Sequence, residues 1–277
     1  VINRHHPEIS YNESPYLELL RLIMNKQIDL IVDWVRVGFI HGVMNTDNMS
    51  VAGETIDYGP CAFINTYDPK TVFSSIDRHG RYAFGNQHKI GYWNLTVFAG
   101  TLLPFIDNDK DKAIELAQNI LNQFPIEYSN KWYEMMYKKL GILEPIEEDK
   151  MLVRNLLTLM ESYKADYTNT FAALTLNKIY KDSLFSSNEF STWKKQWEER
   201  IKNDKSSYKI MGMNNPMYIP RNHLVESSLK NAISGNNKEI DELLSLMSDT
   251  YNYSVKHYGF QTTPEGFDES YKTFCGT

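Results

Sequence analysis

The sequence predicts a mainly helical fold that carries one small β-hairpin in its front part. Apolar residues recur at steps of three and four over long stretches, which is the period of an α-helix with one buried face. By contrast, residues 43–106 contain few such runs and many turn formers, such as Gly59-Pro60. We therefore expect one mostly helical domain over residues 1–277 with a loop-rich, β-containing insertion.

The first long helix is expected to begin at Ser14-Pro15. Serine is a favoured N-cap and proline is favoured at the first helical position. Behind this start one apolar stripe is formed by Leu17, Leu20, Met24, Ile28, Ile31 and Val35. Gly38 and Gly42 then break the pattern, so the helix should end there.

From Asp107 onward the chain is expected to be helical. One amphipathic face, which we expect Pro125 to close, comprises Ala113, Ile114, Ala117, Ile120, Leu121 and Phe124. Further helical stretches are expected roughly at 130–140, 148–163, 169–181, 190–203, 221–234 and 237–250.

Composition excludes several classes of protein. The net charge of −6 and pI near 5.7 argue against a nucleic-acid binder, which usually carries a basic excess. No apolar run approaches the ~18 residues that span a bilayer. Two cysteines in 277 residues exclude a disulfide scaffold and indicate a reducing compartment, so we expect a cytoplasmic protein. The start at Val1, without methionine, indicates a cut.

The chemistry-bearing segment is His41-Gly-Val-Met-Asn-Thr-Asp-Asn48, followed by Asp57-Tyr-Gly. Protein kinases use a catalytic loop H-R-D-x-x-x-x-N and then D-F-G. Here His41 and Asn48 keep the spacing of that loop, and Asp57 begins the tripeptide that stands for D-F-G. Val43 replaces the catalytic-loop aspartate, whereas Asp47 directly precedes Asn48.

The spacing between Asn48 and Asp57 predicts a metal-binding hairpin. Residues 49–51 and 54–56 form two arms around a two-residue turn that ends in Gly53. In that register residue 49 pairs with 56, and Asn48 faces Asp57 at roughly 4.5–5.5 Å. An amide oxygen and a carboxylate so placed can share Mg²⁺, which prefers oxygen ligands.

These motifs resemble the selenoprotein O family. The matching segments are His41–Ser50, Ile56–Pro60, Gly80-Arg81-Tyr82 with Asn86-Gln87, Trp93-Asn94-Leu95, Asn215-Pro216 and Pro220-Arg221-Asn222-His223. Eukaryotic members carry selenocysteine third from the end, where this chain has Cys275. The matches run from Arg4 to Cys275, so the resemblance covers nearly the whole chain.

The resemblance implies a protein-kinase-like fold, with this chain as its C-lobe extended by C-terminal helices. Family members transfer AMP from ATP to Ser, Thr or Tyr hydroxyls of proteins and use Mg²⁺ or Mn²⁺. Carried over residue by residue, Asp47 would be the proton acceptor, and Asn48 and Asp57 the metal ligands. Asp57 would also lie close to the bound nucleotide.

Two departures from the family pattern stand out. The family's glycine-rich loop, phosphate-binding lysine and arginine clamps precede the catalytic loop, and only forty residues precede His41 here. We therefore expect this chain to lack the N-terminal nucleotide-binding lobe and to be inactive alone. Bacterial members can also close a disulfide from the C-terminal cysteine to the segment after D-Y-G. Cys61 is the only cysteine in that segment here, although the family's partner lies further along, near Phe73.

Two other functions remain open. An ordinary phosphotransferase would transfer the γ-phosphate, but Val43 in place of the loop aspartate counts against it. A non-catalytic pseudokinase would serve as a binding module, but it has no need of Asp47, Asn48 and Asp57 together. The expected partners are ATP and protein substrates, without nucleic acid or membrane.

Overall fold

The computed structural model describes residues 1–180, 182–253 and 258–274, which form a mainly helical body with one two-stranded sheet. The prediction of a mainly α fold is confirmed. The α-helices are α1 (Ile2–His5), α2 (Pro15–Val37), α3 (Gln87–Ile106), α4 (Lys110–Leu121), α5 (Phe124–Lys139), α6 (Asp149–Ser162), α7 (Tyr167–Thr175), α8 (Asn188–Ile201), α9 (Ser207–Asn214), α10 (Asn222–Ile233), α11 (Lys238–Met247) and α12 (Phe267–Ser270). The antiparallel strands are β1 (Phe39–Ile40) and β2 (Ala62–Phe63), and short 3₁₀ turns cover Pro7–Tyr11, Thr46–Asn48, Phe84–Asn86 and Tyr258–Phe260.

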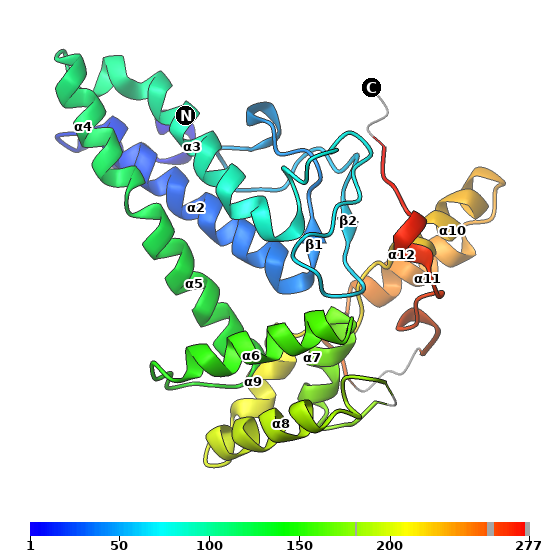
Figure 1. The fold of residues 1–277 in the computed structure, drawn as a ribbon. Coiled ribbons are helices and arrows are strands. Elements are labelled where there is room, and N and C mark those ends of the chain that lie inside the picture. Colours follow the sequence, from blue (N-terminus) through cyan, green and yellow to red (C-terminus); the bar gives the residue numbers. More distant parts are fainter. Residues whose placement is uncertain (181, 254–257, 275–277) are drawn as a thin grey trace.

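The long helix α2 is the centre of the body, and α3, α4 and α5 pack against it (Figure 1). Its predicted stripe is buried except for the half-buried Leu17, with Leu20, Ile28 and Ile31 fully inaccessible. The helix begins at Pro15 as expected, although Ser14 makes no side-chain capping bond. It ends at Gly38, whose φ of 80° lies in the left-handed region that glycine adopts without steric cost.

Helix α3 corrects the expectation that residues 43–106 are mostly loop. Its twenty residues are apolar on most sides, so they lack the one-sided period that marks a surface helix. Gly91 lies where α3 meets α2, and a Cβ atom there would lie 2.4 Å from Ile31 Cδ1, so any larger residue would displace that side chain. That glycine favours close packing of the two helices, but in the sequence it resembles a turn signal.

The remaining helices follow the expected stretches with three differences. Pro125 does not close the preceding helix; it sits in the first turn of α5, where its missing N–H costs nothing. Helix α7 ends at Thr175, shorter than the expected 169–181, and the third difference is that α9 and the one-turn helices α1 and α12 lie outside the expected stretches. No helix in the described residues is both long and apolar enough to cross a membrane.

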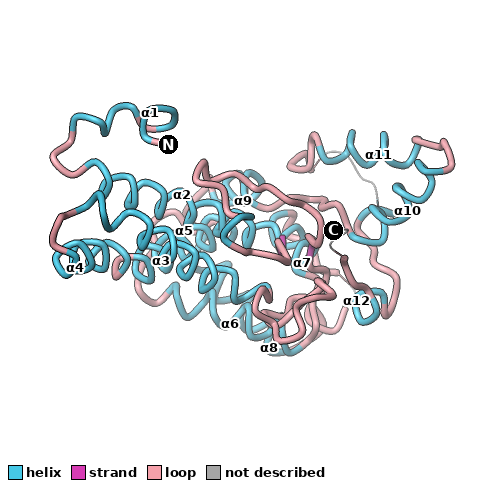
Figure 2. Tube along the Cα trace, turned by 90° about the horizontal axis from the view of Figure 1, so that it is seen from above, coloured by secondary structure: helices cyan, strands magenta, loops and turns pink. Residues whose placement is uncertain are grey.

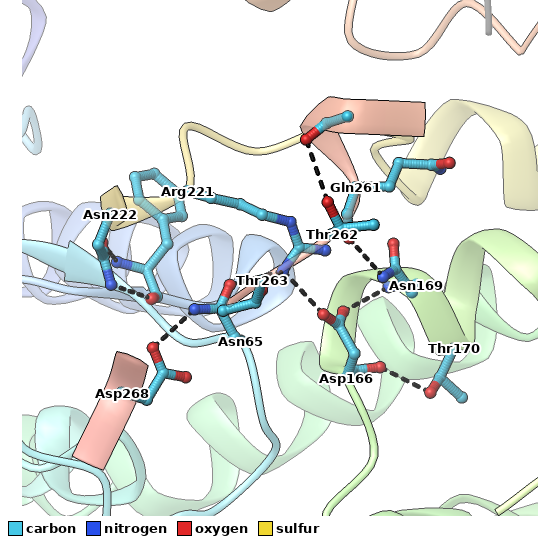
Figure 3. A network of polar contacts seen from close by, with 12 residues as sticks. Asn65, Asp166, Asn169, Thr170, Arg221, Asn222, Gln261, Thr262, Thr263 and Asp268 are labelled. Atoms are coloured by element: carbon cyan, nitrogen blue, oxygen red, sulfur yellow. Dashed lines mark hydrogen bonds and ion pairs between the residues drawn. The ribbon is translucent and has the colours of Figure 1, made fainter. Parts of the chain in front are cut away.

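The helices α10 and α11 lie at the end of the molecule opposite α4 (Figure 2). A buried polar network joins this end to the body (Figure 3). Arg221, 1% exposed, donates from Nη1 to Asn65 Oδ1 at 2.5 Å, Asp166 Oδ2 at 2.7 Å and Thr263 Oγ1 at 3.0 Å. Asn65 in turn donates to Asp268 Oδ1 at 2.7 Å. Four segments that are distant in sequence therefore meet at one guanidinium.

Candidate active site

The loop from His41 to Asn48 is held in place by side-chain amides of α3. Gln87, fully buried, accepts from the His41 N–H at 3.0 Å and donates to the Phe39 carbonyl at 3.0 Å. The His41 N–H and the Phe39 carbonyl point to the same edge of β1. The side-chain amide of Gln87 therefore binds them as the backbone of a neighbouring strand would. About two turns further along α3, Asn94 donates to the Met44 carbonyl at 3.0 Å. The loop is therefore anchored to the core at two points.

The His41 ring joins this loop to the segment that carries Asp57. Its Nε2–H donates to the Ile56 carbonyl at 2.8 Å, and its Nδ1 accepts from the Val43 N–H at 3.4 Å. A carbonyl oxygen can only accept, so these contacts define the neutral Nε2–H tautomer. Burial lowers the pKa of His41, while the nearby Asp57 carboxylate acts in the opposite direction. The ring is thus a neutral link between the two motifs.

The hairpin between Asn48 and Asp57 forms with a different register from the one expected. Met49 pairs with Thr55, not with Ile56, and the turn is closed by the Gly53 N–H donating to the Ser50 carbonyl at 3.0 Å. Gly53 has a φ of 74°, and a Cβ there would lie 2.8 Å from Lys26 Cβ. The expected pairing of Met49 with Ile56 is therefore wrong, whereas Asn48, in the 3₁₀ turn Thr46–Asn48, lies outside the paired residues and its approach to Asp57 stays a prediction.

Side chains of α2 explain this register. Gln27 donates to the Ser50 carbonyl at 2.7 Å, and Lys26 donates to the Ala52 carbonyl at 3.3 Å. Trp34 Nε1 donates to Thr55 Oγ1 at 2.8 Å. These tertiary hydrogen bonds fix both arms and the turn between them, and they outweigh the preference for a two-residue turn on which the expected register depended.

The proposed ligands still lie at one end of this hairpin. Asn48, half-buried, donates from Nδ2 to the Val43 carbonyl at 3.1 Å, which leaves its Oδ1 for a ligand. Asp57 is exposed and has a φ of 54°, the left-handed region that costs a non-glycine residue about 1 kcal/mol or more. Backbone strain of this kind is concentrated at functional sites.

The donor set fits a hard cation that is held partly by the protein. No group of three or more His, Cys, Asp or Glu side chains in the described part of the chain could hold a metal ion. Mg²⁺, however, is usually bound by one or two protein oxygens, with waters and substrate phosphates completing its octahedron. An amide oxygen of Asn48 and the carboxylate of Asp57 match that pattern. Asp47, in the exposed 3₁₀ turn Thr46–Asn48, is free of the core.

The segment after Asp57 is tied to residues near the C-terminus. The Cys61 thiol donates to the Tyr58 carbonyl at 3.1 Å, and burial raises its pKa to about 11. Thr273 donates from Oγ1 to the Pro60 carbonyl at 2.6 Å and from its N–H to the Phe73 carbonyl at 2.9 Å. Cys275 lies outside the described residues, so its pairing with Cys61 stays a prediction.

Sequence reasoning did not give a site role to Gln87, Asn94 or Trp34. A signal was present, because Gln87 and Asn94 are amides within a helix that is otherwise mostly apolar. Buried amides of this kind need partners, and here the partners are backbone groups of β1 and of the His41–Asn48 loop.

Comparison with known proteins assigns the class of protein. The family model described as protein adenylyltransferase SelO matches residues 1–249, so the chain belongs to this family. It is 48% identical to the protein nucleotidyltransferase YdiU of Clostridium botulinum (strain Eklund 17B / Type B), over 100% of this chain and 57% of that protein. It is also 48% identical to the protein of the same name from Bacillus cytotoxicus, over 100% of this chain and 57% of that protein. The chain thus spans rather more than half the length of these relatives.

Proposed function

We propose that this chain is the catalytic-loop part of a protein adenylyltransferase, built like the C-lobe of a protein kinase over residues 1–277. The reaction would move AMP from ATP to Ser, Thr or Tyr hydroxyls of proteins, with Mg²⁺ or Mn²⁺, in the cytoplasm. The observation that carries the proposal is the hydrogen bond from His41 Nε2 to the Ile56 carbonyl. It fixes the His41–Asn48 loop against the Asp57 segment, as catalysis by positioning requires.

Each site residue has one role in this proposal. The exposed Asp47 carboxylate accepts the proton of the attacking hydroxyl. The hydroxyl oxygen bonds to the α-phosphorus, the bond from that phosphorus to the bridging oxygen breaks, and diphosphate leaves. Asn48 Oδ1 and the Asp57 carboxylate would hold the metal ion, which neutralises charge on the phosphates. His41 does no proton transfer, because both its nitrogens are engaged with backbone groups.

The position of Val43 favours AMP transfer over ordinary phosphotransfer. Val43 stands where the kinase loop has its proton-accepting aspartate, and it is 4% exposed with its N–H bound to His41. An apolar buried side chain offers no base at that point. A non-catalytic binding module would have no need for the strained backbone at Asp57, whose side chain is exposed.

The position of the label in ATP separates these possibilities. The complete protein is incubated with Mg²⁺, a protein acceptor and ATP labelled at the α- or the γ-phosphate. We expect transfer of the α label only, and a loss of roughly 10²–10⁴-fold in Asp47→Asn if Asp47 is the general base. Glu54→Gln, an exposed carboxylate in the same hairpin, is the matched control and should retain activity. Transfer of the γ label would indicate a kinase, and no transfer of either label would favour the binding module.

A further inference from the structure

A long groove runs from the loop 69–80 to the catalytic loop. Its outer part is a cavity of about 1030 Å³ lined by Lys70, Arg78, Lys89 and Lys272. Its inner part, of about 780 Å³, shares Arg78 and Lys89 with the outer part and is bounded by Val43 and Asn45. The two cavities thus adjoin along a shared wall and are here called the groove, whose inner part is lined by Asn45, two residues before Asp47 in the chain.

The groove is positively charged although the chain as a whole carries −6. Five cationic side chains line it, all exposed and none in an ion pair among the described residues: Lys70, Arg78, Arg81, Lys89 and Lys272. Among the described residues the one carboxylate in its lining is Asp77, which accepts from the backbone N–H groups of Arg81 and Tyr82, both at 2.8 Å. Its charge is thus partly offset by those N–H dipoles.

The walls of the groove are preorganised by backbone contacts. Asn86 Nδ2 donates to the Gly80 carbonyl at 2.8 Å, and the Gly85 N–H donates to the Pro69 carbonyl at 2.8 Å. A Cβ at Gly85 would lie 3.0 Å from that Pro69 oxygen, so the close approach depends on glycine. Tyr82 donates to Asn45 Oδ1 at 2.7 Å and so joins the groove wall to the catalytic loop. A rigid surface of this kind lowers the entropic cost of binding.

We propose that this basic groove binds an acidic stretch of the protein substrate beside the hydroxyl that receives AMP. The idea rests on the proposed function and adds the class of acceptor. The combined groove is larger than the ~300–1,000 Å³ typical of small-ligand sites, and it is open along its length. Its cations are distributed over both cavities, since Lys70 and Lys272 line only the outer one and Arg81 only the inner one, which suits an extended chain of carboxylates. Its inner end would place the acceptor residue next to Asp47.

The first test measures binding without ATP, so its outcome does not depend on transfer activity. A fluorescent peptide rich in Glu and Asp with one central Ser is titrated with the complete protein at low salt, with anisotropy as the readout. The charge-reversal variant Lys70→Glu/Arg78→Glu/Lys89→Glu should weaken binding about tenfold or more. The control Lys195→Glu/Lys205→Glu/Lys209→Glu reverses three exposed lysines on or near α8 and α9 and should change binding less than about twofold. Equal effects in both variants would overturn the proposal.

Two further readouts identify what the groove prefers. Mg-ATP affinity should be the same in the groove variant and in the unchanged protein; its loss together with intact peptide binding would make the groove a nucleotide site and refute the idea. A single-stranded oligonucleotide of equal charge should bind more weakly than the peptide, and tighter binding would also refute it. If transfer activity is present, the groove variant should raise KM for the acidic peptide with little change in kcat. Melting curves check that all variants fold.

Discussion

Replacing Arg221 by methionine should destabilise the protein far more than the loss of one surface charge. The guanidinium is 1% exposed and donates to Asn65, Asp166 and Thr263 from one nitrogen. Methionine fills much of the same volume but donates nothing. The Asp166 carboxylate, whose side chain is 25% exposed, would then have no cation beside it, and the buried Asn65 oxygen would lose its donor.

The expected loss of stability depends on which partner of Arg221 stays buried after the substitution. Removing one member of a buried ion pair costs about 3–5 kcal/mol, because the other charge stays buried without compensation. Partial exposure of Asp166 favours the lower end, about 3 kcal/mol. For a chain of this size each kcal/mol lowers the midpoint of thermal unfolding by roughly 2–4 °C, so we expect a fall of about 6–12 °C. The double variant Arg221→Met/Asp166→Asn should recover part of this loss, since the unpaired charge is gone.

Urea unfolding followed by circular dichroism measures these differences in the free energy of unfolding. Lys138→Met is the matched control, because Lys138 and Glu134 form an exposed pair one helical turn apart on α5. Such a pair contributes only about 0.3–0.5 kcal/mol. If Arg221→Met costs no more than Lys138→Met, the network in Figure 3 does not hold the C-terminal helices to the body, and the reasoning fails.

Three further predictions concern single residues. The Lys139 Nζ donates to the Arg36 carbonyl, and burial strongly lowers the pKa of this amine in the folded protein. Between that lowered pKa and the unfolded-state pKa of about 10.4, the unfolded chain therefore binds one more proton than the folded protein. The contribution of Lys139 to stability should therefore rise with pH across this window, so in urea titrations stability should rise more steeply with pH in the unchanged protein than in Lys139→Met; equal slopes would contradict it. Gly53→Ala should lower the free energy of unfolding by about 1–2 kcal/mol, because Gly53 has a positive φ and an added Cβ would lie 2.8 Å from Lys26. Gly235 also has a positive φ but has open space around it, so Gly235→Ala is the control that measures the φ penalty alone. Cys61, with a pKa of about 11, should be alkylated at pH ~7.5 about 100-fold more slowly in the folded protein than in urea, as peptide mass mapping would measure; equal rates would show a reactive thiol.

The sequence predicts those parts of the fold whose signals are local. Helix α2 has a one-sided apolar stripe and a Ser-Pro start, and both lie within its own residues. Helix α3 could not be predicted in this way, because apolar residues such as Trp93 and Phe105 also occupy its exposed side and its apolar residues therefore show no period. Its Gly91 lies in the contact with α2, which no local pattern reveals. The Arg221 network joins residues 55 and 156 positions away in the chain, and turn or helix rules do not reach that far.

In the candidate site, too, the sequence predicts the local features and misses those that depend on distant residues. The spacing of His41, Asn48 and Asp57 predicts that the two motifs converge, and the hydrogen bond from His41 to the Ile56 carbonyl is consistent with it. The predicted register of the hairpin is wrong by one residue, because hydrogen bonds from Gln27 and Trp34 on α2 decide it. Those partners lie 21 to 23 positions away, beyond the reach of turn rules.

The anchoring of the His41–Asn48 loop by Gln87 has a consequence for how the protein opens. The His41 amide hydrogen is bonded to a fully buried side chain of α3, so it can exchange with solvent only when α3 leaves the core. The Gly53 amide closes a partly exposed turn and can exchange by local opening. Two amides that lie close together in the chain should therefore differ in exchange rate by orders of magnitude. The start of the loop at His41 would be as stable as the whole fold, while the turn at Gly53 opens and closes within the native state.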